Sequence, residues 1–276
     1  MTGVMGADAP IGVFDSGIGG LSVLKYIRAY LPHEHLLYFA DSGHAPYGGR
    51  SEEEIVARSL AIAEFLMQYR AKALVVACNT ATAAAIKALR ERYPALPLVG
   101  VEPGLKPAAT LTKSGVVGVM ATERTLSSVK FKLLQEQISA KTQVRFLPQP
   151  CIGLADQVEK GELHSTATAK LIRGYVEPLL EQGADTLVLG CTHYPFVLPL
   201  IEEAVRRISA ASIAIVDTGQ PIARQLQRLL TERQLLRAEA QGTVTAFTTA
   251  SETALSTAFS RLLDLQPAVI RVAGHT

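Results

Sequence analysis

The chain has 276 residues, of which 48% are hydrophobic and 19% charged, and its formal net charge is +2 at pH 7. This balance is typical of a globular protein with a sizeable core, and the small net charge argues against a dedicated nucleic-acid surface. The apolar runs are of strand length, well short of the about 20 residues of a membrane-spanning helix, and the first ten residues lack the pattern of a signal peptide. We therefore expect a cytoplasmic protein with neither nucleic-acid nor membrane partners.

Strand-like and helix-like segments alternate along nearly the whole chain. The expected strands are Ile11–Phe14, Leu36–Ala40, Ala73–Ala77, Pro97–Val99, Gly115–Met120, Val144–Phe146, Thr186–Leu189 and Ile213–Val216. Longer amphipathic segments such as Glu52–Tyr69 and Ala167–Glu181 separate them, and Ser51 with Glu54 has the pattern of a capping box. Strands that alternate with helices indicate βαβ units and parallel sheets, so the predicted fold class is α/β.

An internal repeat indicates two related lobes. The segment ALVVACNTATAAAI, from Ala73, parallels TLVLGCTHYPFVLP, from Thr186, and IGVFDSG, from Ile11, parallels VGVMATE, from Val117. Between the two copies, VEPGLKP (101–107) holds two prolines and a glycine, which suits a crossing between lobes.

We expect two pseudo-symmetric lobes, each a mainly parallel sheet flanked by helices, with the active site in the cleft between them. The first lobe would be residues 1–103 with 217–276, carrying Asp15 and Cys78. The second lobe would be residues 104–216, carrying Cys191 and His193. The segment after about residue 217 is expected to fold back onto the first lobe.

Two of the three cysteines have a context that suits acid–base chemistry. Cys78 and Cys191 each follow an expected strand and precede an expected helix. Sites in parallel α/β sheets form outside the carboxyl ends of strands, and a helix N-terminus favours thiolate over thiol. Either cysteine alone could fill space at a strand end, but the matched pair favours a base or nucleophile. No such strand is expected before Cys151, for which we predict a core or loop role.

His193 lies two residues after Cys191 and can exchange a proton near neutral pH, so it either assists catalysis or caps the helix. Cysteine and histidine are also zinc ligands, but Cys-x-His without a second close pair is a poor metal spacing. Three cysteines are too few for a disulfide scaffold, and no CxxC motif of a thiol redox enzyme is present. We therefore expect no metal site.

The loop DSGIGG, Asp15 to Gly20, follows the first expected strand. Its glycines would let backbone N–H groups approach an anion, but it has neither a Walker sequence nor the dinucleotide glycine spacing. A carboxylate in that position repels phosphate and attracts an ammonium group, so Asp15 beside N–H donors suits an amino acid. Other polar residues at expected strand ends, each also suited to a cap or turn, would converge there: Ser16, Asn79, Thr80, Thr122, Thr192 and the loop DSGHAPYGG (41–49).

The motifs GVFDSGIGGLSVL, PYG, ACNTATA, GVEPG and GCTHYP occur in this order and together resemble the glutamate racemases of the aspartate/glutamate racemase superfamily. The resemblance extends from Ile11 to about Asp217. It implies two α/β lobes around a buried site and an isomerase that interconverts L- and D-glutamate without pyridoxal phosphate, metal or any other cofactor. It also implies that the product D-glutamate serves peptidoglycan synthesis.

The resemblance implies roles for individual residues. Cys78 and Cys191 would be the two bases, with Cys191 acting on L-glutamate and Cys78 on D-glutamate. Asp15, His193 and Glu159 would assist them, although the sequence CIGLADQVE that leads to Glu159 departs from the family's Cys-Pro-rich apolar pattern. With Thr122 added from the strand-end cluster, the expected substrate-binding residues are Asp15, Ser16, Pro46, Tyr47, Gly48, Asn79, Thr80, Thr122, Thr192 and His193.

Two alternative functions remain open at this point. A two-lobed protein that binds an amino acid without chemistry would not need a matched cysteine in each lobe. A racemase of the same superfamily could act on another amino acid such as aspartate, although related aspartate and hydantoin racemases lack the DSGIGG and PYG pair. The expected partner is a small-molecule substrate, L- or D-glutamate, and the sequence leaves the oligomeric state open, a homodimer included.

Overall fold

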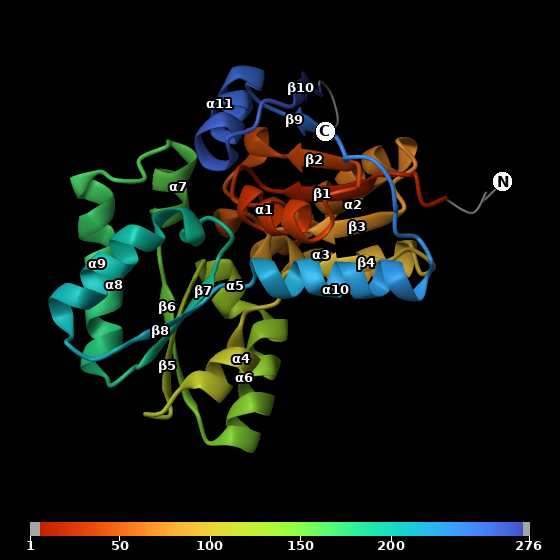
Figure 1. Ribbon diagram of the computed structural model, residues 1–276. Helices are drawn as coiled ribbons and strands as arrows, with labels where there is room; N and C mark the ends of the chain where they lie inside the picture. Colours follow the sequence, from red (N-terminus) through yellow and green to blue (C-terminus); the bar gives the residue numbers. More distant parts are fainter. Residues whose placement is uncertain (1–5, 273–276) are drawn as a thin grey trace. The chain divides into compact units, whose positions relative to one another are not determined.

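The computed structural model describes residues 6–272, which form two compact units. Unit 1 extends to Val101 and resumes at Gly219, and unit 2 is Glu102–Thr218. Each unit is built on one parallel sheet with helices packed on it (Figure 1), which confirms the predicted α/β class. None of the helices in this part of the chain combines the length and the hydropathy needed to cross a membrane.

The sheet of unit 1 has the strand order β10-β9-β2-β1-β3-β4, and all its pairings are parallel. Its strands are β1 (Ile11–Asp15), β2 (Leu36–Ala40), β3 (Ala73–Val76), β4 (Leu98–Gly100), β9 (Val244–Thr248) and β10 (Ala268–Arg271). Its helices are α1 (Leu21–Tyr30), α2 (Glu52–Gln68), α3 (Asn79–Arg92), α10 (Gly219–Glu232) and α11 (Glu252–Leu263), with the 3-10 turns η1 (Ser42–His44) and η2 (Tyr47–Gly49). The predicted capping box of Ser51 and Glu54 opens α2.

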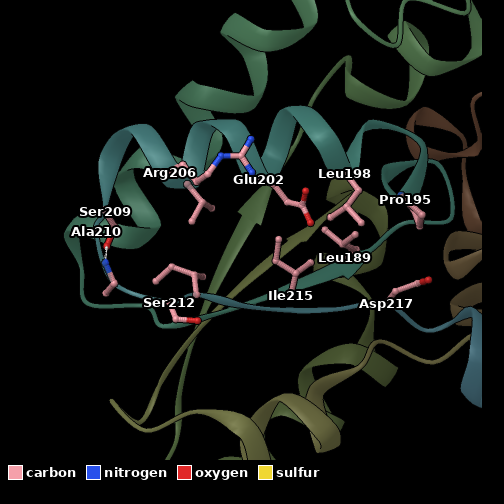
Figure 2. A pocket seen from close by; sticks show the side chains of 13 residues that line it. Leu189, Pro195, Leu198, Glu202, Arg206, Ser209, Ala210, Ser212, Ile215 and Asp217 are labelled. Atoms are coloured by element: carbon pink, nitrogen blue, oxygen red, sulfur yellow. Dashed lines mark hydrogen bonds between the residues drawn. The ribbon is translucent and has the colours of Figure 1, made fainter.

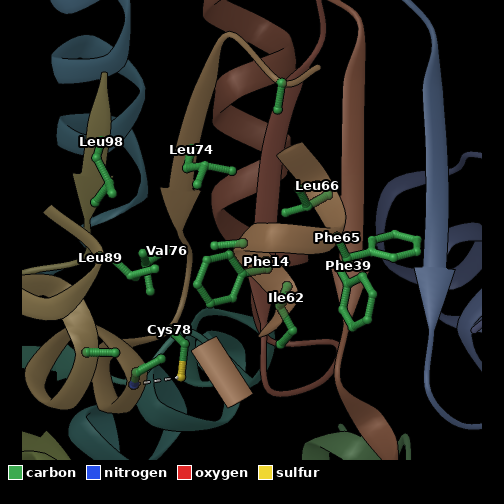
Figure 3. Packing of buried hydrophobic residues seen from close by; sticks show 14 of the residues in the cluster. Phe14, Phe39, Ile62, Phe65, Leu66, Leu74, Val76, Cys78, Leu89 and Leu98 are labelled. Atoms are coloured by element: carbon green, nitrogen blue, oxygen red, sulfur yellow. Dashed lines mark hydrogen bonds between the residues drawn. The ribbon is translucent and has the colours of Figure 1, made fainter. Parts of the chain in front are cut away.

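The central strands β1, β2 and β3 are buried along their whole length, as continuous apolar runs predict for a parallel sheet covered on both faces. On one face, Phe14 and Val76 pack against Ile62 and Leu66 of α2, and this cluster extends to Cys78 (Figure 3). The apolar core therefore reaches the end of β3 and supports the cysteine at that position.

The segment after unit 2 returns to unit 1 and adds α10, β9 and β10. Strand β9 pairs with β2, and β10 pairs with β9. Phe65 of α2 contacts Phe39 and Phe247 with ring centroids 5.2 and 5.0 Å apart, which ties β9 to the core. Neither strand was predicted. Threonines interrupt the apolar residues of β9, and β10 is a short, mostly exposed strand at the sheet edge.

The sheet of unit 2 has the order β6-β5-β7-β8, again all parallel. Its strands are β5 (Val116–Ala121), β6 (Arg145–Pro150), β7 (Thr186–Gly190) and β8 (Ala214–Val216). Its helices are α4 (Leu105–Leu111), α5 (Glu123–Ser127), α6 (Val129–Thr142), α7 (Leu154–Glu159), α8 (Thr166–Glu181) and α9 (Leu198–Ile208), with the 3-10 turn η3 (Tyr194–Val197). The order matches β2-β1-β3-β4 of unit 1, and the repeated segments form the equivalent strand pairs β1 and β5, and β3 and β7.

Strand β6 is longer than the expected Val144–Phe146 and ends immediately before Cys151. The expectation that no strand leads to Cys151 is therefore wrong. The prolines at 148 and 150 disguised the strand, since proline cannot donate to a sheet ladder. They are tolerated here because β6 is an edge strand that pairs only with β5.

A buried ion pair lies at the amino-terminal end of the unit 1 sheet. Lys72 Nζ is 2.5 Å from Glu34 Oε2, and the two side chains are 0% and 1% exposed. The same ammonium donates to the Leu235 carbonyl at 2.8 Å, and the Arg237 N–H donates to Glu34 Oε1 at 3.0 Å. The pair thus ties the segment between α10 and β9 to the first hundred residues.

Replacing Lys72 by methionine is expected to lower the free energy of unfolding by about 3–5 kcal/mol, because Glu34 would become a buried carboxylate without its cation. Urea unfolding followed by circular dichroism measures this loss. The double variant Glu34→Gln/Lys72→Met should recover most of it. Lys87→Met breaks an exposed ion pair with Glu91 and should change stability by less than about 0.5 kcal/mol. Equal losses for the two lysine variants would contradict this expectation.

Candidate active site

The DSGIGG loop wraps around the carboxylate of Asp15, which lies at the end of β1 and is fully buried. The Gly20 N–H donates to Asp15 Oδ2 at 2.5 Å, and Ser16 Oγ donates to Oδ1 at 3.3 Å. The Tyr38 hydroxyl donates to the Gly17 carbonyl at 2.7 Å and holds the turn. A Cβ on Gly20 would lie 2.7 Å from the Cβ of Asp15, so the turn requires glycine there.

Cys78 follows β3 and is the N-cap residue of α3. Its Sγ accepts the Ala81 N–H at 3.4 Å (Figure 3) and lies 3.8 Å from Ser16 Oγ. The sulfur is almost fully buried, at the positive end of a 14-residue helix. A backbone N–H and a helix N-terminus both stabilise a negative charge on sulfur, so this position suits a thiolate base.

Asn79, next to Cys78, has a side chain that is 3% exposed, and neither its Nδ2 nor its Oδ1 has a hydrogen-bond partner among the described residues. Buried polar groups in proteins nearly always have one. The amide therefore needs a partner from outside the protein chain. Together with the neighbouring buried Thr80, it offers polar groups to a ligand beside the Cys78 sulfur.

The PYG sequence lies in the loop between β2 and α2, where Pro46 is exposed, Tyr47 buried and Gly48 half-buried. The Tyr47 ring belongs to the core cluster that contains Cys78. Its hydroxyl donates to Asp41 Oδ2 at 2.6 Å. Burial and the negative charge of Asp41 raise the pKa of Tyr47, so the hydroxyl keeps its proton and remains a donor. This proton is directed at Asp41.

Unit 2 carries a second cluster at the end of β7. His193 Nδ1 lies 3.6 Å from Cys191 Sγ, and His193 Nε2 lies 2.7 Å from Glu159 Oε1 at the end of α7. Cys191 and His193 are 6% and 5% exposed. The three side chains form a continuous chain of polar contacts from carboxylate to imidazole to sulfur.

The charge state of His193 depends on its two neighbours. Burial lowers the pKa of His193, but the hydrogen bonds and negative charges of Cys191 and Glu159 outweigh it and raise the pKa well above 6.5. An imidazole with a raised pKa, held between a carboxylate and a sulfur, is placed to exchange a proton with a neighbouring group.

Cys191 differs from Cys78 in the structure of the next residues along the chain. After Cys191 the chain continues into η3, a 3-10 turn that contains Pro195, and α9 begins only at Leu198. The expectation that a helix N-terminus lies directly after Cys191 is therefore wrong. Here His193, held by Glu159, is the polar group beside the sulfur, whereas a helix end lies beside the sulfur of Cys78.

Two other predicted residues lie near the same edge of the unit 2 sheet. Thr192 is buried between Cys191 and His193 in sequence. Thr122 follows β5 and caps α5, because its Oγ1 accepts the Thr125 N–H at 3.3 Å and donates to Thr125 Oγ1 at 2.9 Å. Of the two roles that the sequence allowed for Thr122, the structure shows the capping role.

Cys151 also lies at this edge, directly after β6. Cys151 is 3% exposed, and its Sγ contacts the Gln149 carbonyl at 3.5 Å. The Tyr194 hydroxyl donates to the Cys151 carbonyl at 3.5 Å. Burial raises the pKa of the Cys151 thiol far above its ordinary value. This cysteine is therefore held neutral and is unsuited to act as a base.

A groove of about 820 Å³ lies in unit 2 between α9 and β8, lined by residues that include Leu198, Arg206, Ile215 and Asp217 (Figure 2). None of the predicted site residues lines it. Within residues 6–272, no group of three or more His, Cys, Asp or Glu side chains is arranged to hold a metal ion.

The sequence profile of the Asp/Glu/Hydantoin racemase family matches residues 14–226. The chain belongs to this family. A glutamate racemase of Ectopseudomonas mendocina is 57% identical to this racemase over 230 residues, which are 83% of this chain and 85% of the relative.

Solved structures of glutamate racemases have the same fold. An isoform from Bacillus anthracis is 33% identical, with a TM-score of 0.86 over 96% of this chain and 97% of that one. The protein from Francisella tularensis, solved in complex with D-glutamate, is 27% identical, with a TM-score of 0.84 over 98% of each chain.

Sequence reasoning included Asp41 in the binding loop without giving it a role, and it missed Arg58 altogether. Asp41 accepts the Tyr47 hydroxyl, and Arg58 pairs with Asp41. The available signal was an arginine between Ile55 and Ile62 on the apolar face of α2, where an unpaired charge would be costly. Tyr194, which contacts Cys151, lies inside GCTHYP, but nothing local indicated its contact.

Replacing Glu159 by glutamine is expected to lower the pKa of His193, because the neighbouring negative charge is lost. A ¹⁵N NMR titration of the imidazole measures the change, with the signal of exposed His164 as internal reference. Since the folded pKa of His193 lies above 6.5, its contribution to stability is present below pH 6.5 and is lost as pH rises through the folded pKa. An unchanged His193 titration in the variant would show that Glu159 does not set its charge.

Proposed function

We propose that this protein is a glutamate racemase that interconverts L- and D-glutamate, supplying D-glutamate for peptidoglycan synthesis. The observation that carries the proposal is a buried thiol within two residues of the end of each of the equivalent strands β3 and β7, in a member of this racemase family. The Francisella relative binds D-glutamate, which supports a small-molecule substrate. We place the reaction in the cytoplasm, because none of the three cysteines forms a disulfide and a reducing compartment keeps thiols in that state.

The proposed mechanism uses one thiol from each unit. The α-hydrogen of an amino acid is very weakly acidic, and racemisation must return a proton to the opposite face of the α-carbon. Cys191 as thiolate takes the α-proton of L-glutamate, and the Cys78 thiol delivers its proton to the other face. The reverse turnover starts with Cys78 as thiolate and Cys191 as thiol.

The surroundings of each sulfur support this exchange of protonation states. At Cys78, the Ala81 N–H and the α3 N-terminus stabilise the thiolate, and Asp15 lies beside Ser16 as the ammonium-binding carboxylate. At Cys191, the His193 imidazolium stabilises the thiolate, and Glu159 holds the imidazole.

Hydrogen-bond donors would bind the substrate carboxylates and stabilise the carbanion-like transition state. We assign this role to Ser16, Asn79, Thr80 and Thr192, with the Pro46–Gly48 turn completing the binding site. The unpartnered Asn79 amide supports the assignment most directly. A protein that only binds an amino acid would need polar donors but no matched thiols.

Racemisation can be followed directly in D₂O. The purified protein incubated with L-glutamate, with no pyridoxal phosphate, nucleotide or metal added, should lose both optical rotation and the α-proton NMR signal. We expect kcat/KM for glutamate to exceed that for aspartate. A higher kcat/KM for aspartate would show that the enzyme is an aspartate racemase. Activity that disappears with a chelator and returns with metal would refute the two-thiol mechanism.

Mutation should distinguish the roles of the three cysteines in racemisation. Cys78→Ser and Cys191→Ser should each lower kcat by roughly 10²–10⁴-fold, because serine is a far weaker acid than cysteine. Each variant should still eliminate a β-substituent from one enantiomer of a glutamate analogue, and the two variants should prefer opposite enantiomers. Cys151→Ser, the matched control, should remain largely active because that thiol is buried and neutral. Wild-type racemisation by both single variants would exclude the mechanism.

A further inference from the structure

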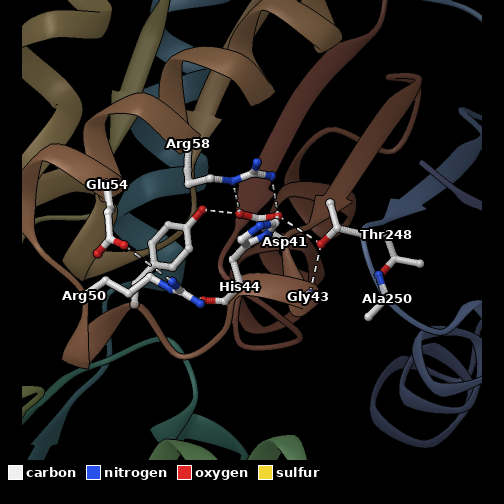
Figure 4. A network of polar contacts seen from close by, with 10 residues as sticks. Asp41, Gly43, His44, Arg50, Glu54, Arg58, Thr248 and Ala250 are labelled. Atoms are coloured by element: carbon white, nitrogen blue, oxygen red, sulfur yellow. Dashed lines mark hydrogen bonds and ion pairs between the residues drawn. The ribbon is translucent and has the colours of Figure 1, made fainter. Parts of the chain in front are cut away.

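Asp41 lies directly after β2, and its carboxylate is fully buried. Arg58 of α2 binds it with two nearly parallel hydrogen bonds, from Nη2 to Oδ1 at 2.8 Å and from Nε to Oδ2 at 3.0 Å (Figure 4). The Arg58 side chain is itself only 10% exposed. Bidentate pairing of this kind is stronger and more directional than a single contact, so it fixes the carboxylate plane.

The remaining lone pairs of Asp41 are used by groups from two other segments. The Tyr47 hydroxyl donates to Oδ2 at 2.6 Å, and His44 Nδ1 lies 3.0 Å from Oδ1. Thr249, in the turn between β9 and α11, donates from Oγ1 to Oδ1 at 2.9 Å. One carboxylate thus joins the loop between β2 and α2 (residues 41–51), helix α2 and the C-terminal segment.

Thr249 makes a second contact with the same loop. Its Oγ1 accepts the Gly43 N–H at 2.9 Å. A Cβ on Gly43 would lie 2.9 Å from the Thr249 carbonyl oxygen, so the two backbones approach as closely as glycine allows. The start of the loop is therefore held against a turn 206 residues away in sequence.

We propose that Asp41, Arg58 and Thr249 are positioning residues that hold the loop of residues 41–51 in the conformation that binds the substrate side chain. The inference rests on the proposed function for its substrate, glutamate. In this arrangement the Tyr47 hydroxyl anchors the loop to Asp41 and does not donate to the substrate. The other groups of the loop then bind the substrate, and the network keeps the loop backbone that carries them in a fixed position.

Two observations place this network at the reaction site as well as in the core. The loop's turn η2 packs against α3, the helix that Cys78 caps, and Tyr47 shares a packing cluster with Cys78. The charge state is also suitable: burial raises the pKa of Asp41, but the hydrogen bonds from Arg58 and Tyr47 and the charge of Arg58 outweigh it and lower the pKa. The carboxylate stays ionised and keeps all its acceptor positions.

Thr249 offers the sharpest test, because Thr249→Val preserves shape and removes the hydroxyl contacts to Asp41 and Gly43. A loosened loop weakens ground-state and transition-state binding alike, so KM for glutamate should rise about 5–10-fold with kcat within about twofold. Thr249→Ser keeps the hydroxyl and should restore the wild-type KM. Thr257→Val, on the exposed face of α11, is the matched control and should change neither constant.

Arg58 gives a second, graded test. Arg58→Lys keeps the positive charge but loses the two hydrogen bonds of the guanidinium group. Arg58→Met should raise KM more than Thr249→Val does, and Arg58→Lys should raise it by a factor between that of Arg58→Met and wild type. Melting temperature is measured for every variant, because Arg58→Met leaves Asp41 buried without its cation and can destabilise the fold.

Hydrogen–deuterium exchange without substrate tests the loop independently of activity. Amides of residues 42–49 should exchange about 5–10-fold faster in Thr249→Val than in wild type and Thr249→Ser, because the loop opens locally at lower cost. Unchanged exchange and KM in Thr249→Val and Arg58→Lys would overturn the inference. If kcat of the variants instead falls in proportion to their melting temperature, and Thr249→Ser does not restore it, these residues have only a structural role. If the wild type does not racemise glutamate, the proposed function fails, and the exchange comparison still decides whether the network positions the loop.

Discussion

Parallel strand pairing is the constraint on which the rest of this structure depends. Each crossover returns the chain to the same end of the sheet, so every strand of a unit ends at one edge. Asp15, Asp41 and Cys78 in unit 1 and Thr122, Cys151 and Cys191 in unit 2 lie at the ends of these strands or within two residues after them. Polar and cysteine side chains therefore gather at one edge of each sheet without long loops, and the buried strands behind them support that edge.

The two units repeat one topology but stabilise their thiols in different ways. Cys78 relies on a backbone N–H and a helix N-terminus, which carry no titratable group. Cys191 relies on His193 and Glu159, whose charges change with pH. In the proposed mechanism, a negative charge on sulfur would thus be supported by a fixed dipole in unit 1 and by an ionisable chain in unit 2.

Buried ion pairs fasten the returning C-terminal segment to unit 1 at both ends of the sheet. At the amino-terminal end, Lys72 and Glu34 bind the backbone of Leu235 and Arg237. At the carboxyl end, the Asp41–Arg58 pair binds Thr249. In both cases a charge that is costly to bury becomes favourable only when its partner is in place. The segment after unit 2 is therefore fixed in unit 1 by directional contacts in addition to the apolar packing of Phe247.

The sequence by itself determined the features that depend on local or periodic signals. Continuous apolar runs gave the buried strands, the capping box located the start of α2, and the repeat placed Cys78 and Cys191 after equivalent strands. The tertiary structure alone decided strands β9 and β10 and the extension of β6 to Pro150, because partly exposed strands and a strand with two prolines lack the pattern of a buried strand. It also decided the partner of Arg58. A buried charge on an apolar helix face indicates that a partner exists, but that partner, Asp41, lies 17 residues away in sequence and is itself held by Thr249, 208 residues from Asp41.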